Sequence, residues 1–157
     1  MPETFADERA VEDHIRTLIA DRITTQYRYI YTLKNKKVAD IVICHDGENP
    51  ALFFIEVKYF KVNHNRLGFG AGSGSGYQPE ILTRRPAYLE TNLRWILSTD
   101  REPTPSYLFI PTSTLLKYVA GGEIGEKQNN IQRKIFEEVR SLNDGELADE
   151  MCRWLTK

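Results

Sequence analysis

Three charged side chains stand among apolar residues, in positions where charge is unusual: Asp40, Glu56 and Lys58. Glu56 and Lys58 belong to an apolar run over 52–60 that is typical of a strand. Side chains of a strand alternate between its two faces, so we expect Glu56 and Lys58 to point one way and Val57 the other. If the strand that carries Asp40 pairs with this run, two carboxylates lie a few ångströms apart, and they repel each other unless a cation lies between them.

This arrangement suits a hard divalent cation. Mg²⁺ is often held by one or two carboxylates, with water and substrate phosphate as its other ligands. A neighbouring lysine such as Lys58 can orient or deprotonate a water, or stabilise charge on the attacked phosphate. The alternative is that Asp40 is a turn or edge residue and that Glu56 and Lys58 form a surface pair. The apolar residues on both sides of that pair argue against this alternative.

The elements that would position these residues can be read from periodicity. Apolar residues recur at three- and four-residue steps over 5–23, which predicts an amphipathic helix. Alternation and β-branched or aromatic residues predict strands at 26–33, 38–43 and 52–60, and their short connections favour antiparallel hairpins. Further along we expect a helix at 79–97 broken or kinked at Pro86, a strand at 107–110, and helices at 113–120, 127–142 and 146–155. The order α-β-β-β-α-β, followed by extra C-terminal helices, indicates an α/β (α+β) fold with a mixed sheet and helices on its faces.

Asp40 and the Glu56-Val57-Lys58 segment that begins sixteen residues later resemble the motif of the PD-(D/E)XK nuclease superfamily. The resemblance covers about 5–110, where the expected order matches the superfamily's α-β-β-β-α-β core, the restriction endonuclease-like fold. It implies that Asp40, Glu56 and the backbone carbonyl of Val57 bind a metal and that Lys58 is catalytic. A bare E-x-K is common, and the motif's proline before the aspartate is Ala39 here.

The resemblance also suggests two further catalytic residues. Many members carry a glutamate on the first helix that faces the site, and Glu12 matches best, with Glu8 one turn earlier as a substitute. A solvated acid on an exposed helix face is the alternative. Gln78 resembles a glutamine that some subfamilies place near the metal, although it could simply begin a helix.

A glycine-rich segment over 68–76 holds five glycines and two serines, and it matches neither a dinucleotide-binding fingerprint nor a nucleotide-binding P-loop. Asn and Arg side chains near it could read base edges, and Arg and Ser could hold phosphates. An alternative is a linker with no role. The candidate DNA-binding residues are Lys36, Lys37, Lys61, Asn63, His64, Arg66, Ser73, Ser75, Arg84 and Arg85.

The bulk properties fit a small enzyme that acts on DNA. With 157 residues and 41% hydrophobic content, the chain is expected to form a single nuclease domain over 1–157, with its core at about 5–110 and C-terminal helices at about 113–157. The formal charge of −1 argues mildly against a protein that coats nucleic acid. Basic residues collect in the middle of the chain, where they could bind phosphates, and ordinary solvated faces are the alternative. Two distant cysteines and no long apolar run predict a cytoplasmic protein that does not bind membranes.

We therefore expect a deoxyribonuclease that uses Mg²⁺, with Mn²⁺ as a possible substitute, and that hydrolyses phosphodiester bonds of DNA. The long insert after 52–60 favours a type II restriction-like enzyme, and a Holliday junction resolvase, a homing nuclease or a repair nuclease are alternatives. One site cuts one strand, so a double-strand cutter would be a homodimer or a higher homo-oligomer. Two other readings remain: a non-catalytic DNA-binding module that retains the fold, and an unrelated α+β protein.

Overall fold

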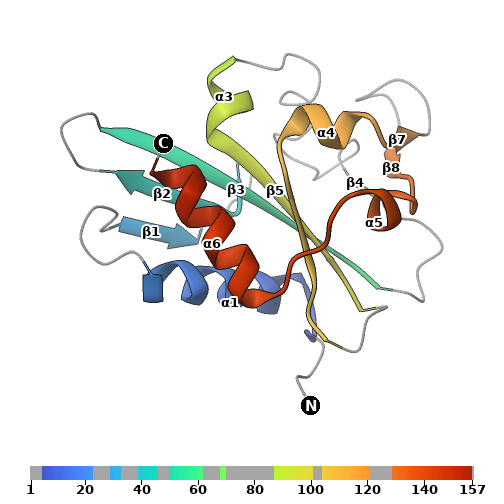
Figure 1. Ribbon diagram of the computed structural model, residues 1–157, viewed down its shortest axis with the longest axis horizontal. Helices are drawn as coiled ribbons and strands as arrows, with labels where there is room; N and C mark the ends of the chain where they lie inside the picture. Colours follow the sequence, from blue (N-terminus) through green and yellow to red (C-terminus); the bar gives the residue numbers. More distant parts are fainter. Residues whose placement is uncertain are drawn as a thin grey trace.

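The computed structural model of the protein describes residues 5–22, 29–32, 39–45, 50–61, 68–69, 87–100, 104–120 and 129–156. A five-stranded sheet runs through the middle of the molecule, with strand order β1-β2-β3-β5-β6 (Figure 1). All neighbouring strands are antiparallel except β3 and β5, which are parallel. The strands are β1 (Tyr29–Thr32), β2 (Ile41–His45), β3 (Ala51–Phe60), β5 (Leu93–Thr99) and β6 (Tyr107–Ile110).

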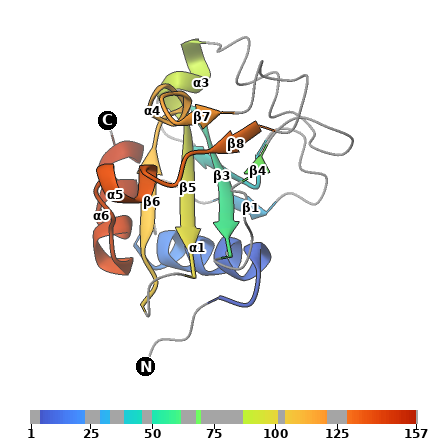
Figure 2. The same ribbon diagram turned by 90° about the vertical axis from the view of Figure 1, so that its right-hand side faces the viewer.

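Two helices cover one face of this sheet, α1 (Glu8–Arg22) and α6 (Asp144–Leu155) (Figure 2). Asp7 caps the start of α1, because its side chain accepts a hydrogen bond of 2.8 Å from the Ala10 amide. Asn143 and Glu146 form a reciprocal capping box that begins α6. Both helices bury their apolar stripes against β2, β3 and β6, and this fixes the position of α1 relative to the strands.

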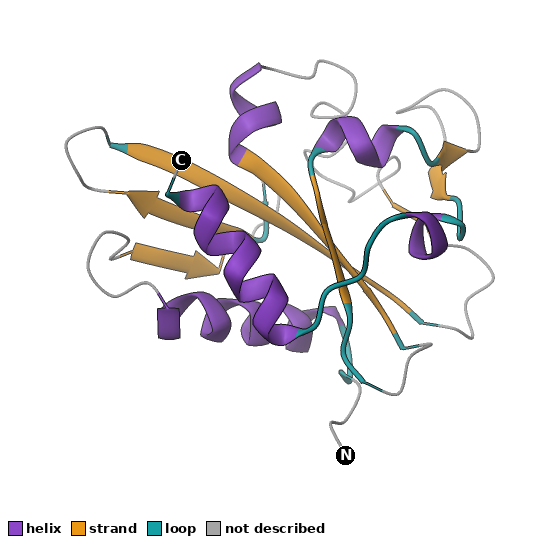
Figure 3. Ribbon diagram, in the orientation of Figure 1, coloured by secondary structure: helices purple, strands orange, loops and turns teal. Residues whose placement is uncertain are grey.

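The other face is covered by shorter elements (Figure 3). A second core forms there around Phe60, Trp95 and Leu97, and it includes side chains from two of the short helices. The elements on this side are the helices α3 (Ala87–Asn92), α4 (Thr112–Leu116) and α5 (Ile135–Glu138), together with a small sheet of β4 (Gly68–Phe69), β8 (Asn129–Ile131) and β7 (Val119–Ala120). Among the described residues, no helix is long and apolar enough to cross a membrane.

The predicted fold class is confirmed. The elements α1, β1, β2, β3, α3 and β5 supply the α-β-β-β-α-β order of the restriction endonuclease-like core. The second and third strands form the expected antiparallel pair, with Ile41 opposite Ile55. The helix predicted at 146–155 is also present, as part of α6.

The helix predicted over 79–97 is wrong for its last part. Only Ala87–Asn92 is helical, and Leu93–Thr99 is strand β5, while residues 79–86 lie outside the described residues. β5 lies between β3 and β6 and is buried on both faces, so its apolar residues at 93 and 95–97 do not alternate with polar ones, and periodicity cannot distinguish them from part of a buried helix. The core's last strand is therefore β5, and the strand predicted at 107–110 is an additional one, β6.

The helices predicted at 113–120 and 127–142 are also only partly correct. α4 ends at Leu116 and is followed by β7, and the second segment contains β8, the short α5 and an extended stretch whose Leu142 exchanges two backbone hydrogen bonds with Tyr107. Ile131, Ile135 and Leu142 are buried as an apolar pattern requires, but Ile135 lies in a helix whereas Ile131 and Leu142 lie in extended backbone.

Candidate active site

The candidate site lies where β3 continues beyond the end of its neighbour β2. The pairing of the two strands ends with Ile41 opposite Ile55, whereas β3 runs on to Phe60. Asp40 lies immediately before β2, and its backbone amide donates to the Ile55 carbonyl at 3.0 Å. Its side chain then satisfies a β3 amide that β2 does not reach, because Oδ2 accepts a hydrogen bond of 2.7 Å from the Val57 amide. The carboxylate of Asp40 is thereby fixed beside the part of β3 that extends beyond its pairing with β2.

Glu56 and Lys58 project from the next part of β3. They share the face that carries Phe60, Trp95 and Leu97, whereas Ile55 and Val57 pack into the core on the α1 side. Glu56 is buried, and the Lys58 Nζ lies 3.5 Å from its Oε1. The strand alternation expected from the sequence therefore places a lysine ammonium next to a buried carboxylate.

The electrostatics of Glu56 are unusual. Burial is the main reason why its pKa rises from the ordinary value of 4.5 to about 8, and the negative charges of Asp40 and Glu8 add to the effect. Lys58 opposes the shift through its charge and its hydrogen bond. A carboxyl group in this environment is stabilised in its charged form by an added cation, since the cation offsets both the burial and the neighbouring negative charges.

Helix α1 brings two more carboxylates to this place. Glu8 and Glu12 stand one turn apart on the same side of the helix. One carboxylate oxygen from each lies within 4.8 Å of the other and of an oxygen of Asp40. Glu12 and Asp40 are fully buried, and Glu8 is half-buried, with its Oε2 accepting a hydrogen bond of 3.4 Å from the Tyr59 amide. Both glutamates that the sequence offered as alternatives are therefore near Asp40.

The donor chemistry fits a hard divalent cation. Carboxylate oxygens from Glu8, Glu12 and Asp40 converge, and they are the ligand type that Mg²⁺ and Mn²⁺ prefer. The Val57 amide points to Asp40, and in an extended strand the carbonyl of the same residue lies on the same edge, which is where the sequence predicted a backbone ligand. Among the described residues, the closest group of possible ligands includes the two helix glutamates rather than Glu56, which lies next to the group and interacts with it electrostatically.

Most of the predicted DNA-binding residues lie outside the described residues. Lys61 is half-buried and follows Phe60 at the end of β3. The catalytic candidate Gln78 lies outside the described residues, as do the other DNA-binding candidates and 70–76 of the glycine-rich segment. Those outside are Lys36, Lys37, Asn63, His64, Arg66, Ser73, Ser75, Arg84 and Arg85.

Sequence reasoning predicts Glu12 at the site and offers Glu8 only as its substitute, yet both glutamates approach Asp40. Their spacing of four residues is the signal that could have shown this, because side chains four apart on a helix lie on one face.

No protein-family model and no curated protein sequence matches this chain. Among solved structures, the chain is similar to the Holliday junction resolvase Hjc from Archaeoglobus fulgidus, with 17% sequence identity and a TM-score of 0.45. The match covers 87% of this chain and 93% of that chain.

Proposed function

We propose that this protein is a metal-dependent deoxyribonuclease that hydrolyses phosphodiester bonds at the edge of β3. The observation that carries the proposal is the convergence of carboxylates from Glu8, Glu12 and Asp40, next to the buried Glu56 and the Lys58 ammonium that lies beside it. Burying several like charges together is costly, and proteins that retain such groups commonly use them for function. A role in stability alone would be better served by apolar residues at the same positions.

The proposed roles follow from position and charge. Asp40 and Glu56 would hold the metal, with Glu12, Glu8 and the Val57 carbonyl as further oxygen ligands, and the bound Mg²⁺ would act as a Lewis acid toward the scissile phosphate. Lys58 would orient the attacking water or stabilise negative charge that develops on the phosphate. In the reaction, water attacks phosphorus and the bond to the 3′ oxygen breaks.

The preferred DNA substrate is a finer proposal. A type II restriction-like enzyme was favoured by the insert after β3, most of which lies outside the described residues. A Holliday junction resolvase is the alternative within the same superfamily. Either enzyme makes two cuts, and because one such site cuts one strand we propose that the active form is a homodimer.

The activity is tested with supercoiled plasmid in Mg²⁺, Mn²⁺, Ca²⁺ and EDTA. We expect cutting in Mg²⁺ and Mn²⁺, and DNA binding with little turnover in Ca²⁺, which is larger and less demanding in geometry. Asp40→Asn is the matched control against a contaminating nuclease and should not cut. DNA binding without cutting in any metal would favour the non-catalytic module, and cutting in EDTA equal to that in Mg²⁺ would refute the metal assignment.

Substrate choice is tested on the same preparations. Linear duplexes of mixed sequence and an immobile four-way junction are compared at equal concentration. Paired cuts across the junction, with duplexes left intact, identify a resolvase, whereas discrete duplex fragments identify a restriction-like enzyme.

A further inference from the structure

The part of β3 that extends beyond its pairing with β2 also contacts the segment that leads into α1. Beyond Ile55, every second backbone amide of β3 points to the side on which β2 lies. Two of these amides donate hydrogen bonds to carboxylates: the Val57 amide to Asp40 and the Tyr59 amide to Glu8. Tyr59 follows Lys58 directly, and its side chain lies on the α1 side, against the core that contains Val57. Tyr59 therefore connects the strand that carries Glu56 and Lys58 with the first turn of α1.

The side chain of Tyr59 makes a second contact with the same turn. Its hydroxyl donates a hydrogen bond of 3.0 Å to the Phe5 carbonyl, three residues before Glu8. A phenol hydroxyl is protonated at neutral pH, so it can donate this hydrogen bond to the carbonyl. The backbone and the side chain of Tyr59 thus hold two points of the α1 entry, Glu8 and Phe5.

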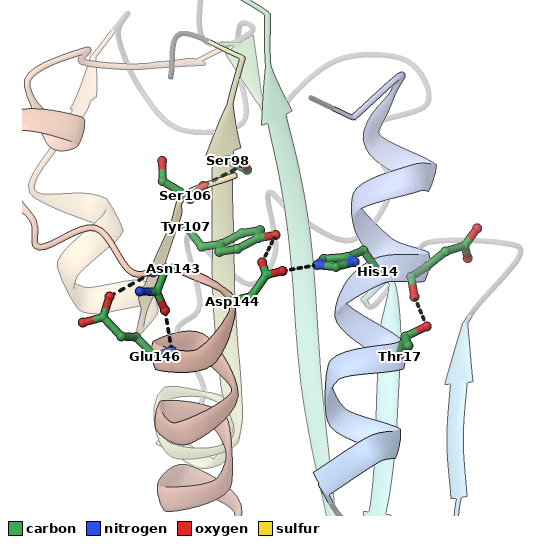
Figure 4. Close-up of polar contacts among 9 residues, drawn as sticks. His14, Thr17, Ser98, Ser106, Tyr107, Asn143, Asp144 and Glu146 are labelled. Carbon is green, nitrogen blue, oxygen red and sulfur yellow. Dashed lines mark hydrogen bonds and ion pairs between the residues drawn. The ribbon is translucent and has the colours of Figure 1, made fainter. Parts of the chain in front are cut away.

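The Phe5 ring is itself held by a cluster of aromatic side chains. It contacts Tyr59 edge-on, with centroids 6.2 Å apart, and it lies 5.2 Å from the ring of His14 and 6.3 Å from that of Tyr107. Asp144, at the start of α6, accepts a hydrogen bond of 2.7 Å from the Tyr107 hydroxyl and lies 3.0 Å from His14 Nε2 (Figure 4). The α1 entry therefore contacts β6 through Phe5 and Tyr107, which Asp144 links to α6, and it contacts β3 through Tyr59.

We propose that Tyr59 is a positioning residue for the metal site, which acts by holding Phe5 and the first turn of α1 so that Glu8 stays beside Glu12 and Asp40. The inference rests on the proposed function. It also extends that function, because Tyr59 itself supplies no metal ligand and its hydroxyl lies on the α1 side of β3. Without the hydroxyl, the turn loses one of the two hydrogen bonds that Tyr59 makes with it, so holding Glu8 at the metal costs more conformational entropy.

The test compares two Tyr→Phe variants that each remove a hydroxyl that joins β3 to another segment by a hydrogen bond. Tyr59→Phe removes the bond near the site. Tyr88→Phe is the matched control, because the Tyr88 hydroxyl donates to the Leu52 carbonyl at 2.7 Å and accepts from the Leu52 amide at 3.1 Å, at the opposite end of the same strand. Mn²⁺ affinity is measured by calorimetry without DNA, and plasmid cutting is measured as a function of metal concentration.

We expect Tyr59→Phe to weaken Mn²⁺ binding about three- to tenfold, as the loss of one hydrogen bond can. The cutting rate at saturating metal should stay close to that of the parent, and Tyr88→Phe should leave Mn²⁺ affinity unchanged. In a Glu8→Gln background, Tyr59→Phe should have little further effect, because the two residues act on the same ligand.

The inference is overturned if the parent binds metal and cuts DNA but Tyr59→Phe behaves like Tyr88→Phe, or if the effects of Tyr59→Phe and Glu8→Gln simply add. A parent that neither binds Mn²⁺ nor cuts DNA would instead overturn the proposed function, and the inference with it. The two failures are thus distinguished by the behaviour of the parent protein.

Discussion

The two ends of β3 are completed in different ways. At its beginning, Leu52 is not paired with β5, and neutral side chains bind its backbone instead. The Tyr88 hydroxyl bonds to both its amide and its carbonyl, and the Asn92 side-chain amide donates to the same carbonyl at 2.9 Å. At its other end, beyond the reach of β2, carboxylates of Asp40 and Glu8 accept from the strand amides. Both solutions satisfy backbone groups, but only the second collects negative charge in a partly buried place.

The beginning of β3 thus serves the stability of the fold, whereas its other end serves the proposed site. Neutral caps complete the beginning of β3 at little electrostatic cost, whereas the carboxylates bring repulsion that a cation would relieve. The contrast leads to predictions that run from a near-complete loss of activity to a shift of a few degrees in melting temperature.

The largest expected effect is at Lys58. Lys58→Ala should lower the rate of cutting by about 10³-fold, because a positive charge beside the reacting phosphate is lost. DNA affinity, measured in Ca²⁺, should stay within a few fold, since one lysine is a small part of a phosphate-binding surface. Lys58→Arg should also fail, because a planar guanidinium does not replace a compact ammonium. Near-normal rates in both variants would move the catalytic centre away from β3.

The framework is tested at Ile55, the last residue of β3 that pairs with β2. Its side chain is fully buried against α1, so Ile55→Ala should lower the free energy of unfolding by about 2–5 kcal/mol, measured by urea denaturation. The gain in melting temperature on adding Mn²⁺ should remain close to that of the parent. Loss of the metal response at unchanged stability would show that the two parts of the strand are not separable in this way.

The pKa of Glu56 gives a pH dependence of defined sign. Because folding raises this pKa from 4.5 to about 8, the folded state holds the proton more tightly. The contribution of protonated Glu56 to the stability of the folded state is complete below about pH 4.5 and is lost as the pH rises through 8. Between these values, the free energy of unfolding falls by at most about 1.4 kcal/mol per pH unit on account of this group.

The measurement compares the parent with Glu56→Gln in EDTA between pH 5 and 8. The parent should lose stability relative to the variant as the pH rises, and Mn²⁺ should bind the parent more tightly at pH 8 than at pH 5, because metal and proton compete. Parallel pH profiles of the two proteins would contradict the assigned environment of Glu56.

The sequence was sufficient for those features that depend on local alternation. Glu56 and Lys58 share a face because side chains of a strand alternate, and the charged residues stood out because their neighbours are apolar. β5 was mistaken for helix because a strand buried on both faces has no alternation to detect. The four-residue spacing of Glu8 and Glu12 places them on one face of α1, but the contact of that face with Asp40 depends on how α1 crosses the end of β3, which is a tertiary contact.

The most direct test of the carboxylate site is the thermal stability of Asp40→Asn with and without metal. Asparagine keeps an oxygen that can accept from the Val57 amide, but it removes one negative charge from beside Glu8, Glu12 and Glu56. In EDTA the variant should therefore melt higher than the parent, by about 1–2 kcal/mol or a few degrees. Added Mg²⁺ or Mn²⁺ should stabilise it less than the parent, and cutting should be lost. A variant that melts lower than the parent in EDTA, and that still cuts DNA, would contradict the proposed site.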